Sequence, residues 1–349
     1  MEVKMPEFKE ILRQLCSVMT ITGCERNAFE EIRQNYGEYF DEIYTDMARN
    51  VILVKKSKRM TRDIKPKIIL DAHLDEVGMI VSGITDEGLL RITPVGGIDR
   101  KILPASEVTV YGKEKLFGVV SSLSPHLKKD KSDKAPEWSE ILIDIGYSKD
   151  GAEKLVELGT PVGYAYSGDE LLNGRLTGRG LDDKSCAAAL IAAVISSPAE
   201  ELTCDTYITL SSGEETGRGG VACAAFEIKP DCALICDVNF AAQPGLSSGD
   251  GASKLDSGVM VSISAATDRR FTKHVISLAK DNEIPYTTTI EPTSTGTNAD
   301  CIAYVNEGVP AAVIGLPLGG MHSYNEELSL TDAESMIKLV RTLVTNPLY

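Results

Sequence analysis

The chain has 349 residues, of which 43% are hydrophobic and 25% are charged, and its formal net charge at pH 7 is −15. This is the composition of an ordinary globular protein that can bury a core in one large domain or two smaller ones. The strong negative charge argues against nucleic acids and anionic membranes as partners, because both repel an acidic protein.

The N-terminal segment carries apolar residues at helical spacing. Phe8, Ile11, Leu12, Leu15 and Met19 predict an amphipathic helix and not a signal peptide. No apolar run approaches the roughly 20 residues that a membrane helix needs. The eight cysteines form no CxxC pair, and most stand among apolar or small residues. We therefore expect reduced thiols in a cytoplasmic protein.

Two β-like segments come next, at 43–56 and 65–75. After them the pattern of predicted elements changes. Residues 77–165 consist of short β-like runs separated by glycine, proline and charged turns, with one helical stretch near 148–159. We predict a β-rich, barrel-like domain at 77–165. It is inserted between the two parts of a catalytic domain, at 1–76 and 166–349.

From residue 166 onward, predicted helices and strands alternate. We expect strands at 207–210, 230–238, 259–266 and 311–317, and helices at 187–195, at 271–283 and from about 330 to the C-terminus. Asp182 or Asp183 is expected to cap the first of these helices, and Thr331 with Glu334 fits a capping box for the last. Alternating elements predict an α/β fold with a mixed, mostly parallel sheet between layers of helices.

Four histidines occur, and their surroundings differ. His274 lies within a predicted helix and His126 in a charged turn, so we expect surface or structural roles for both. His73 ends an apolar strand two residues before Asp75, and a carboxylate at that spacing could orient a metal-bound imidazole. A single histidine at a strand end is, however, more often held by hydrogen bonds alone.

Further polar residues also follow apolar strands, where ligands gather in open α/β sheets. They are Asp182, Asp183, Glu214, Glu215, Asp237 and His322. Each acid alone could cap a helix or occupy a solvated turn. Together with His73, these residues suit the binding of two divalent metal ions such as Zn²⁺, Co²⁺ or Mn²⁺. One aspartate can bridge the two ions.

Each metal of such a pair then needs one histidine and one further carboxylate. Five ligands complete the pair, namely His73, Asp182, Glu215, Asp237 and His322. Glu214 is left over, and the attacking water needs a general base.

Six motifs stand in an order that resembles the M42 aminopeptidases, which are dinuclear metallopeptidases. They are "DAHLDEVGMIV", "GRGLDDKSC", "SSGEETGRGG", "ICDVNF", "TSTGTNAD" and "GMHSYNEE". The resemblance covers nearly the whole chain, and "PVGG", "GVVSSLSPHL" and "ILIDIGYSKDGAEKL" in the insert are similar to the family's dimerisation domain. It implies a zinc-peptidase fold, peptide substrates with a free N-terminus, and homo-oligomers that are dimers and commonly a dodecamer.

The resemblance also implies a role for each site residue. Asp182 would bridge the metals, His73 and Asp237 would complete one site, and Glu215 and His322 the other. Glu214 would be the general base, and Asp75 would orient His73.

Three departures from the family pattern leave these residues intact. They are Lys184 with Cys186, the displacement of a basic residue to Arg218, and the pair Gly319 and Gly320. We expect the substrate pocket to be walled by loops within 287–300 and 317–327.

Three other functions are compatible with parts of this pattern. A deacylase or another amide hydrolase could use the same metal pair. An endoglucanase is less expected, because glycosidases usually place a carboxylate pair around the glycosidic bond. A non-catalytic assembly or binding protein is the third alternative, and the complete ligand set argues against it.

Overall fold

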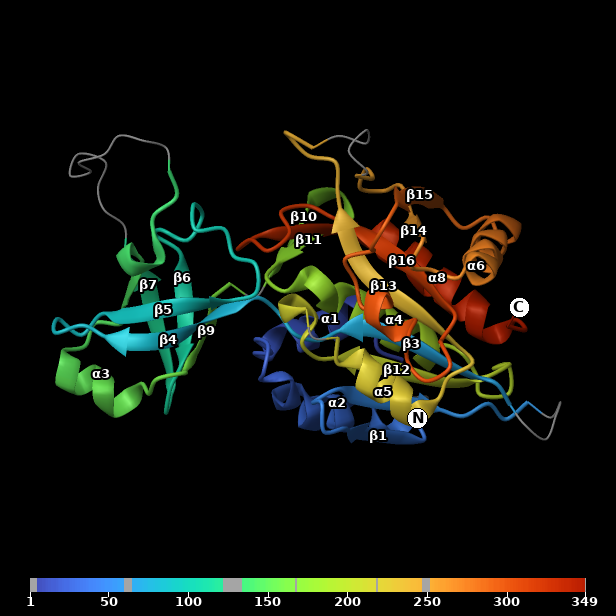
Figure 1. Ribbon diagram of the computed structural model, residues 1–349, viewed down its shortest axis with the longest axis horizontal. Coiled ribbons are helices and arrows are strands. Elements are labelled where there is room, and N and C mark those ends of the chain that lie inside the picture. Colours follow the sequence, from blue (N-terminus) through green and yellow to red (C-terminus); the bar gives the residue numbers. More distant parts are fainter. Residues whose placement is uncertain are drawn as a thin grey trace.

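Two lobes of unequal size make up the protein (Figure 1). The computed structural model describes residues 5–59, 65–121, 134–166, 168–217, 219–246 and 252–348. His126 and Arg218, which the sequence analysis singled out, lie outside these residues. The larger lobe holds a wide sheet and most helices, and the smaller lobe holds a barrel.

An eight-stranded mixed sheet runs through the larger lobe in the order β1-β2-β12-β3-β13-β16-β14-β15. In that order the strands are β1 (Glu42–Thr45), β2 (Val51–Lys55), β12 (Asp205–Ser211), β3 (Lys67–His73), β13 (Cys232–Phe240), β16 (Ala311–Leu318), β14 (Val259–Ser264) and β15 (Tyr286–Glu291). The neighbours β12, β3, β13 and β16 pair in parallel. Their carboxyl ends therefore lie at one edge of the sheet.

Helices cover both faces of this sheet, which gives three layers. One core cluster includes residues of α1 (Phe8–Ser17), α2 (Phe29–Tyr36), α4 (Leu181–Ile195), α6 (Arg269–Asp281) and α8 (Leu330–Thr345). The other includes residues of α5 (Val221–Ile228) and α7 (Ala299–Ile302). Along β3, Ile68 and Leu70 belong to the first cluster and Ile69 to the second, as the two-residue period of a strand requires. The predicted fold class is confirmed.

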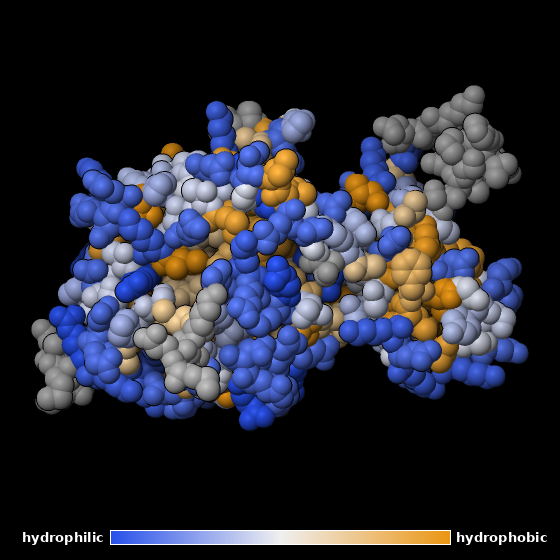
Figure 2. Space-filling model, turned by 180° about the vertical axis from the view of Figure 1, so that it is seen from behind, coloured by the Kyte–Doolittle hydropathy of each residue, from blue (hydrophilic) through white to orange (hydrophobic). Residues whose placement is uncertain are grey.

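The smaller lobe is a closed barrel of antiparallel pairs. Around the barrel the strands are β4 (Gly78–Ile84), β5 (Leu90–Val95), β8 (Leu142–Asp144), β7 (Lys115–Val120), β6 (Glu107–Tyr111) and β9 (Pro161–Tyr164), with α3 (Lys149–Leu155) packed outside. Residues of β7 alternate between buried and exposed. Its outward face nevertheless carries Phe117 and Val119, and apolar side chains gather over this lobe in Figure 2.

A small antiparallel sheet, which the sequence did not predict, joins two chain segments near the edge of the large sheet at which the parallel strands end. It comprises β10 (Asp169–Leu171), β11 (Arg175–Gly178) and β17 (Glu326–Ser329). Single 3-10 turns complete the elements, namely η1 (Glu25–Ala28), η2 (Gly37–Tyr39), η4 (Trp138–Glu140), η5 (Leu172–Gly174) and η6 (Glu214–Thr216). Pairing of Gly178 with Glu326 brings the segment before α4 beside the segment before α8.

Two local predictions are wrong. The last helix is capped by Ser329, whose hydroxyl accepts from the backbone N–H of Thr331, and not by the predicted box of Thr331 and Glu334. This happens because α8 follows β17 directly and begins at Leu330. The predicted pocket loop at 287–300 begins as part of β15.

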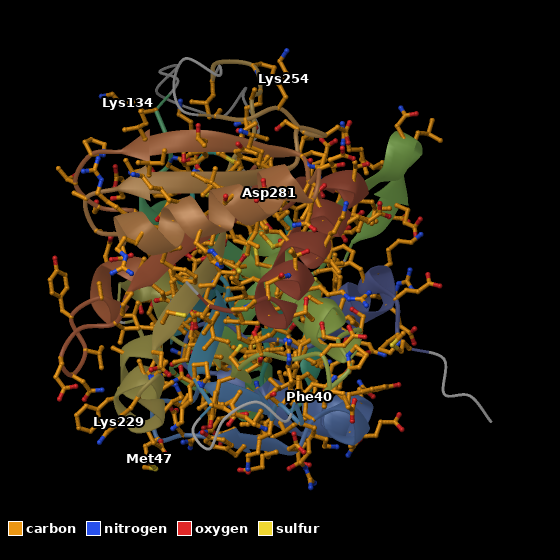
Figure 3. The ribbon with its side chains drawn as sticks, turned by 90° about the vertical axis from the view of Figure 1, so that its right-hand side faces the viewer. Phe40, Met47, Lys134, Lys229, Lys254 and Asp281 are labelled. Atoms are coloured by element: carbon orange, nitrogen blue, oxygen red, sulfur yellow. The ribbon has the colours of Figure 1, made fainter. Side chains whose placement is uncertain are left out.

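Exposed apolar residues also occur outside the barrel. Met47, in the turn between β1 and β2, is 90% exposed and points outward at the periphery in Figure 3. Among the helices of the described residues, none has the length and apolar character needed to cross a bilayer.

Candidate metal centre

Residues at the carboxyl ends of the four parallel strands converge on one site. His73 is the last residue of β3, and Asp237 lies near the end of β13. Glu214 and Glu215 form the turn η6 just after β12, and His322 follows β16. Parallel pairing brings these chain-distant residues together, as the sequence analysis expected.

Asp182 lies between the two histidines of this site. Its Oδ1 atom is 2.9 Å from Nε2 of His73, and its Oδ2 atom is 3.3 Å from Nε2 of His322. The residue belongs to the first turn of α4, where its φ and ψ angles are not helical. Neither Asp182 nor Asp183 caps α4, whose N-cap is Gly180, so that prediction is wrong. The carboxylate of Asp182 instead faces the site.

The remaining candidate ligands pair with one histidine each. Oε2 of Glu215 lies 3.3 Å from Nε2 of His322. Oδ1 of Asp237 lies 3.8 Å from Nε2 of His73, and Oε2 of Glu214 lies 4.0 Å from the same atom. All five predicted ligands and the predicted base thus surround one small volume.

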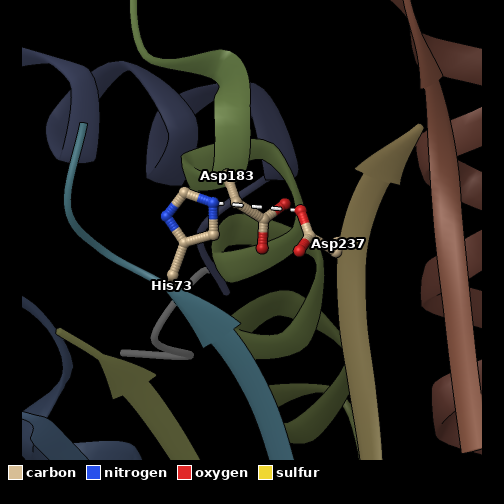
Figure 4. A group of neighbouring side chains, drawn as sticks. All are labelled: His73, Asp183 and Asp237. Atoms are coloured by element: carbon tan, nitrogen blue, oxygen red, sulfur yellow. Dashed lines mark ion pairs between the residues drawn. The ribbon is translucent and has the colours of Figure 1, made fainter. Parts of the chain in front are cut away.

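Asp183 also belongs to this cluster, although the predicted ligand set left it out. Ligand atoms of His73, Asp183 and Asp237 lie within 4.8 Å of one another, and so do those of His73, Asp182 and Glu215. Figure 4 shows Asp183 beside the pair formed by His73 and Asp237. Sequence spacing could not distinguish the two neighbouring aspartates, because both precede the same predicted helix at 187–195.

Asp75 contacts the site in two ways. Nδ1 of His73 is 2.9 Å from the backbone oxygen of Asp75 and 3.6 Å from its carboxylate Oδ1, so the backbone is the closer partner. The Asp75 carboxylate accepts from the backbone N–H groups of Glu214 and Glu215 at 3.1 and 3.3 Å, and from Thr22 Oγ1. Asp75 therefore fixes the glutamate turn as well as the histidine.

The barrel lobe also reaches the centre, through the loop after β5. His322 forms a hydrogen bond with the backbone of Gly97. A Cβ atom on Gly97 would stand 3.1 Å from Nδ1 of His322, so the contact is close. In the sequence, "PVGG" is only one motif of the insert, and no local signal indicates that it touches a candidate ligand.

Burial and crowding raise the pKa values of the acids at this centre. Burial, and next the charge of Asp182, raise the pKa of Glu215 to about 10. Burial is also the main cause that raises the pKa values of Asp237 and Glu214. Burial would lower the pKa of His73, but its hydrogen bond to Asp182 and neighbouring charges raise it well above its ordinary value. Such crowding of carboxylates is relieved by bound cations.

Buried charges also hold the segment that carries Asp182. Arg179 and Lys184 both pair with the carboxylate of Glu76, and Lys184 Nζ lies 3.1 Å from its Oε1. Lys184, one of the departures from the family pattern, is fully buried. Cys186, the other, is buried next to Asp183 and interacts with it.

A cavity of about 740 Å³ opens at the centre. Its walls include side chains from both predicted pocket segments, and they also include further acids. The residues that line it are Gly97, Asp182, Glu214, Glu215, Gly217, Gly219, Asp237, Val238, Asn239, Phe240, Met260, Ser262, Glu291, Thr295, Gly296, Thr297, Asn298, Asp300, Cys301, Val313, Gly315, Met321 and His322. Gly319 and Gly320 come directly before Met321 and His322, which line the cavity. Gly320 has a φ of +65°, and a Cβ there would meet the backbone oxygen of Asn325 at 2.8 Å.

Comparison with known proteins identifies relatives over the whole chain. The model of the M42 glutamyl aminopeptidase family matches residues 50–339. A lysyl aminopeptidase of Pyrococcus furiosus is 30% identical and covers 96% of this chain and 96% of its own length. The structure is similar to a TET aminopeptidase from Thaumarchaeota archaeon SCGC AB-539-E09, with a TM-score of 0.90, 29% identity, and coverage of 97% and 96% of the two chains. It is also similar to the Pyrococcus horikoshii TET1 peptidase, which can assemble into a tetrahedron or a large octahedral shell, with a TM-score of 0.84, 28% identity, and coverage of 97% and 99%.

These matches agree with the motifs and with the fold. The family match includes the barrel and all the residues that converge at the carboxyl ends of the parallel strands. The relatives extend over nearly the full length of the chain and are themselves aminopeptidases. The chain therefore belongs to the M42 family, and it is a peptide hydrolase that acts on the N-termini of its substrates.

Proposed function

We propose that this protein is an aminopeptidase that depends on two divalent metal ions. The observation that carries the proposal is the position of Asp182, whose two carboxylate oxygens face two different histidines at 2.9 and 3.3 Å. A carboxylate in that position suits a bridge between two metals. His73 and Asp237 would complete one site, and Glu215 and His322 the other.

The donor set fits such ions. Two imidazoles and three carboxylates are ligands that Zn²⁺, Co²⁺ and Mn²⁺ accept. Oε1 of Glu215 and both carboxylate oxygens of Asp183 are buried without a hydrogen-bond partner that satisfies normal geometry. Buried acceptors of this kind are costly unless a cation or a donor satisfies them. We propose that the two bound ions are Zn²⁺ or Co²⁺.

When bound, the ions would lower the pKa of a water molecule and polarise the scissile carbonyl. Glu214 is the proposed general base, which takes a proton from the attacking water and passes it to the leaving amine. Both glutamates line the cavity, but the Glu214 side chain is 18% exposed, whereas that of Glu215 is 4% exposed and lies 3.3 Å from His322. This difference supports a base at Glu214 and a ligand at Glu215. Asp75 would hold both residues in register through their backbone N–H groups.

The proposed substrates are peptides with a free N-terminus. The name of the matched family refers to glutamyl residues and that of the Pyrococcus furiosus relative to lysyl residues. The preferred N-terminal residue therefore has to be measured for this chain. A panel of aminoacyl chromogenic substrates, assayed beside N-acyl amino acids, separates an aminopeptidase from a deacylase.

Two substitutions test the roles of the adjacent glutamates. Glu214→Gln should keep both metals and lower kcat by about 10²–10⁴-fold, because it removes the general base. Glu215→Gln should lower the metal content at one site. Metal analysis and turnover are measured on both variants. A Glu214→Gln protein that has lost metal, beside a fully loaded and active Glu215→Gln protein, would reverse the assignment.

Assembly and location form the last part of the proposal. The insert at 77–165 is the proposed dimerisation domain, between catalytic parts at 1–76 and 166–349. Dimers could then build a dodecamer. Support comes from the exposed apolar residues on the barrel and from the shells that the Pyrococcus horikoshii relative forms. The cytoplasm is the proposed location, and eight unpaired cysteines support it.

A further inference from the structure

Glu326 is a buried acid beside the candidate metal centre, and neither the predicted ligands nor the predicted base include it. It is the first residue of β17 and is 2% exposed. Oε2 of its carboxylate accepts from the backbone N–H of Asp182 at 3.2 Å. Oε1 accepts from the backbone N–H of His322 at 2.9 Å.

One carboxylate thus holds two chain segments that are far apart in the sequence. Asp182 lies just beyond β11, and His322 lies in the loop between β16 and β17. The small sheet supports this arrangement, because Gly178 at the end of β11 pairs with Glu326 itself. Burial shields both hydrogen bonds from competing water, which strengthens them.

These backbone contacts bear directly on the direction of two candidate ligands. Asp182 has to present one oxygen to each histidine, and His322 has to present Nε2 to Asp182 and Glu215. We infer that Glu326 is a positioning residue that sets the separation of Asp182 and His322, and thereby the affinity of the centre for divalent metal. The inference rests on the proposed function, because it assigns both residues to the metal pair.

Glu326→Gln is the direct test. The amide keeps one acceptor oxygen but turns an NH₂ group toward a backbone N–H, so one of the two contacts is lost. Partners of metal ligands typically contribute about 10–100-fold to metal affinity. We expect Co²⁺ to bind the variant 10–100-fold more weakly than the wild type, with an altered visible absorption spectrum, when both are titrated against a competing chelator.

Glu327→Gln is the matched control. Glu327 is the next residue of β17, its side chain is 41% exposed, and its Oε1 atom lies 3.5 Å from Nε of Arg175. We expect wild-type Co²⁺ affinity and spectrum. The melting temperature of each metal-free protein is measured as well, because a purely structural role would lower that temperature and leave Co²⁺ affinity unchanged.

Glu326→Asp separates the position of the acceptor from its chemical type, and it serves as well if the glutamine variant does not fold. It keeps the carboxyl group, but the shorter side chain cannot reach both N–H groups, so we expect weakened Co²⁺ binding here too. Wild-type affinity in Glu326→Asp or in Glu326→Gln would overturn the inference. So would an equal loss in Glu327→Gln. A wild-type protein that binds no divalent metal in the same titration would instead overturn the proposed function, and the inference with it.

Discussion

Backbone groups aim several side chains of the candidate centre. The backbone oxygen of Asp75 lies 2.9 Å from Nδ1 of His73, and the backbone of Gly97 holds His322. In both cases one ring nitrogen is engaged by the chain, and Nε2 is turned toward Asp182. A side chain that is held in this way loses little freedom when it binds a ligand.

Gly97 offers a test of this arrangement at the level of one residue. In Gly97→Ala the added Cβ would stand 3.1 Å from Nδ1 of His322, which is tighter than usual contact. We expect the imidazole to shift and kcat to fall by about 10-fold, accompanied by weaker metal binding. Steady-state kinetics at limiting metal, together with metal analysis, measure the effect.

Gly37→Ala is the control for this substitution. Gly37 follows α2 and begins η2, and a Cβ there meets nothing within 4 Å. It should keep wild-type kinetics. Full activity and full metal content in Gly97→Ala would show that the backbone contact has no role in aiming His322.

At the scale of elements, a buried ionic cluster joins the segment after β3 to the start of α4. Glu76 accepts from the backbone N–H of Thr20 and pairs with Arg179 and Lys184. Burial alone would raise the pKa of Glu76, but the charges of Lys184 and Arg179 outweigh it and hold that pKa at about 2. The carboxylate is therefore charged at neutral pH.

This pKa predicts how stability depends on pH. A carboxyl group with a pKa of about 2 when folded and 4.5 ordinarily stabilises the fold above pH 4.5, and loses that contribution as the pH falls toward 2. We expect Glu76→Gln to lower the free energy of unfolding at pH 7 by on the order of 3 kcal/mol, since each pKa unit corresponds to about 1.36 kcal/mol. The difference from wild type should shrink between pH 4.5 and pH 2. Denaturant titrations at several pH values measure it.

An exposed ion pair provides the comparison. Glu42 pairs with Lys56 at the surface, where such pairs contribute about 0–1 kcal/mol. Glu42→Gln should therefore change stability little at any pH. A difference between Glu76→Gln and wild type that stays constant from pH 7 to pH 3 would contradict the linkage.

The sequence predicted most of the large elements, because their periodicity is local. Apolar runs before His73, Glu214 and Asp237 marked strands, and alternation with helices indicated a shared edge. Pairings between distant segments have no local signature, so the small sheet that joins β11 to β17 was missed. For the same reason the contacts of Gly97 and Glu326 could not be predicted. Spacing alone treats Asp182 and Asp183 alike, and the predicted ligand set included only Asp182, although Asp183 also lies in the cluster.

The whole molecule presents an apolar face on the barrel lobe that a monomer would leave in water. Phe117 is 60% exposed and Val119 is 38% exposed, both on the outward side of β7. If the barrel joins subunits, Phe117→Glu combined with Val119→Glu should dissociate the oligomer, because charges would be buried at the interface. Light scattering coupled to size-exclusion chromatography measures the mass.

Tyr304→Glu is the matched surface substitution in the other lobe. Tyr304 is 80% exposed, just beyond α7. It should leave the mass of the particle unchanged. A wild-type protein that runs as a monomer, or a barrel variant with the wild-type mass, would refute this interface.

The position of the barrel in the chain has a consequence for biosynthesis. His73 precedes the barrel, and the other candidate ligands follow it, of which His322 is the last in the sequence. A ribosome therefore releases all six barrel strands before it has made a complete set of metal ligands. If the barrel joins subunits, two chains could therefore associate through finished barrels while the proposed metal centre still lacks His322.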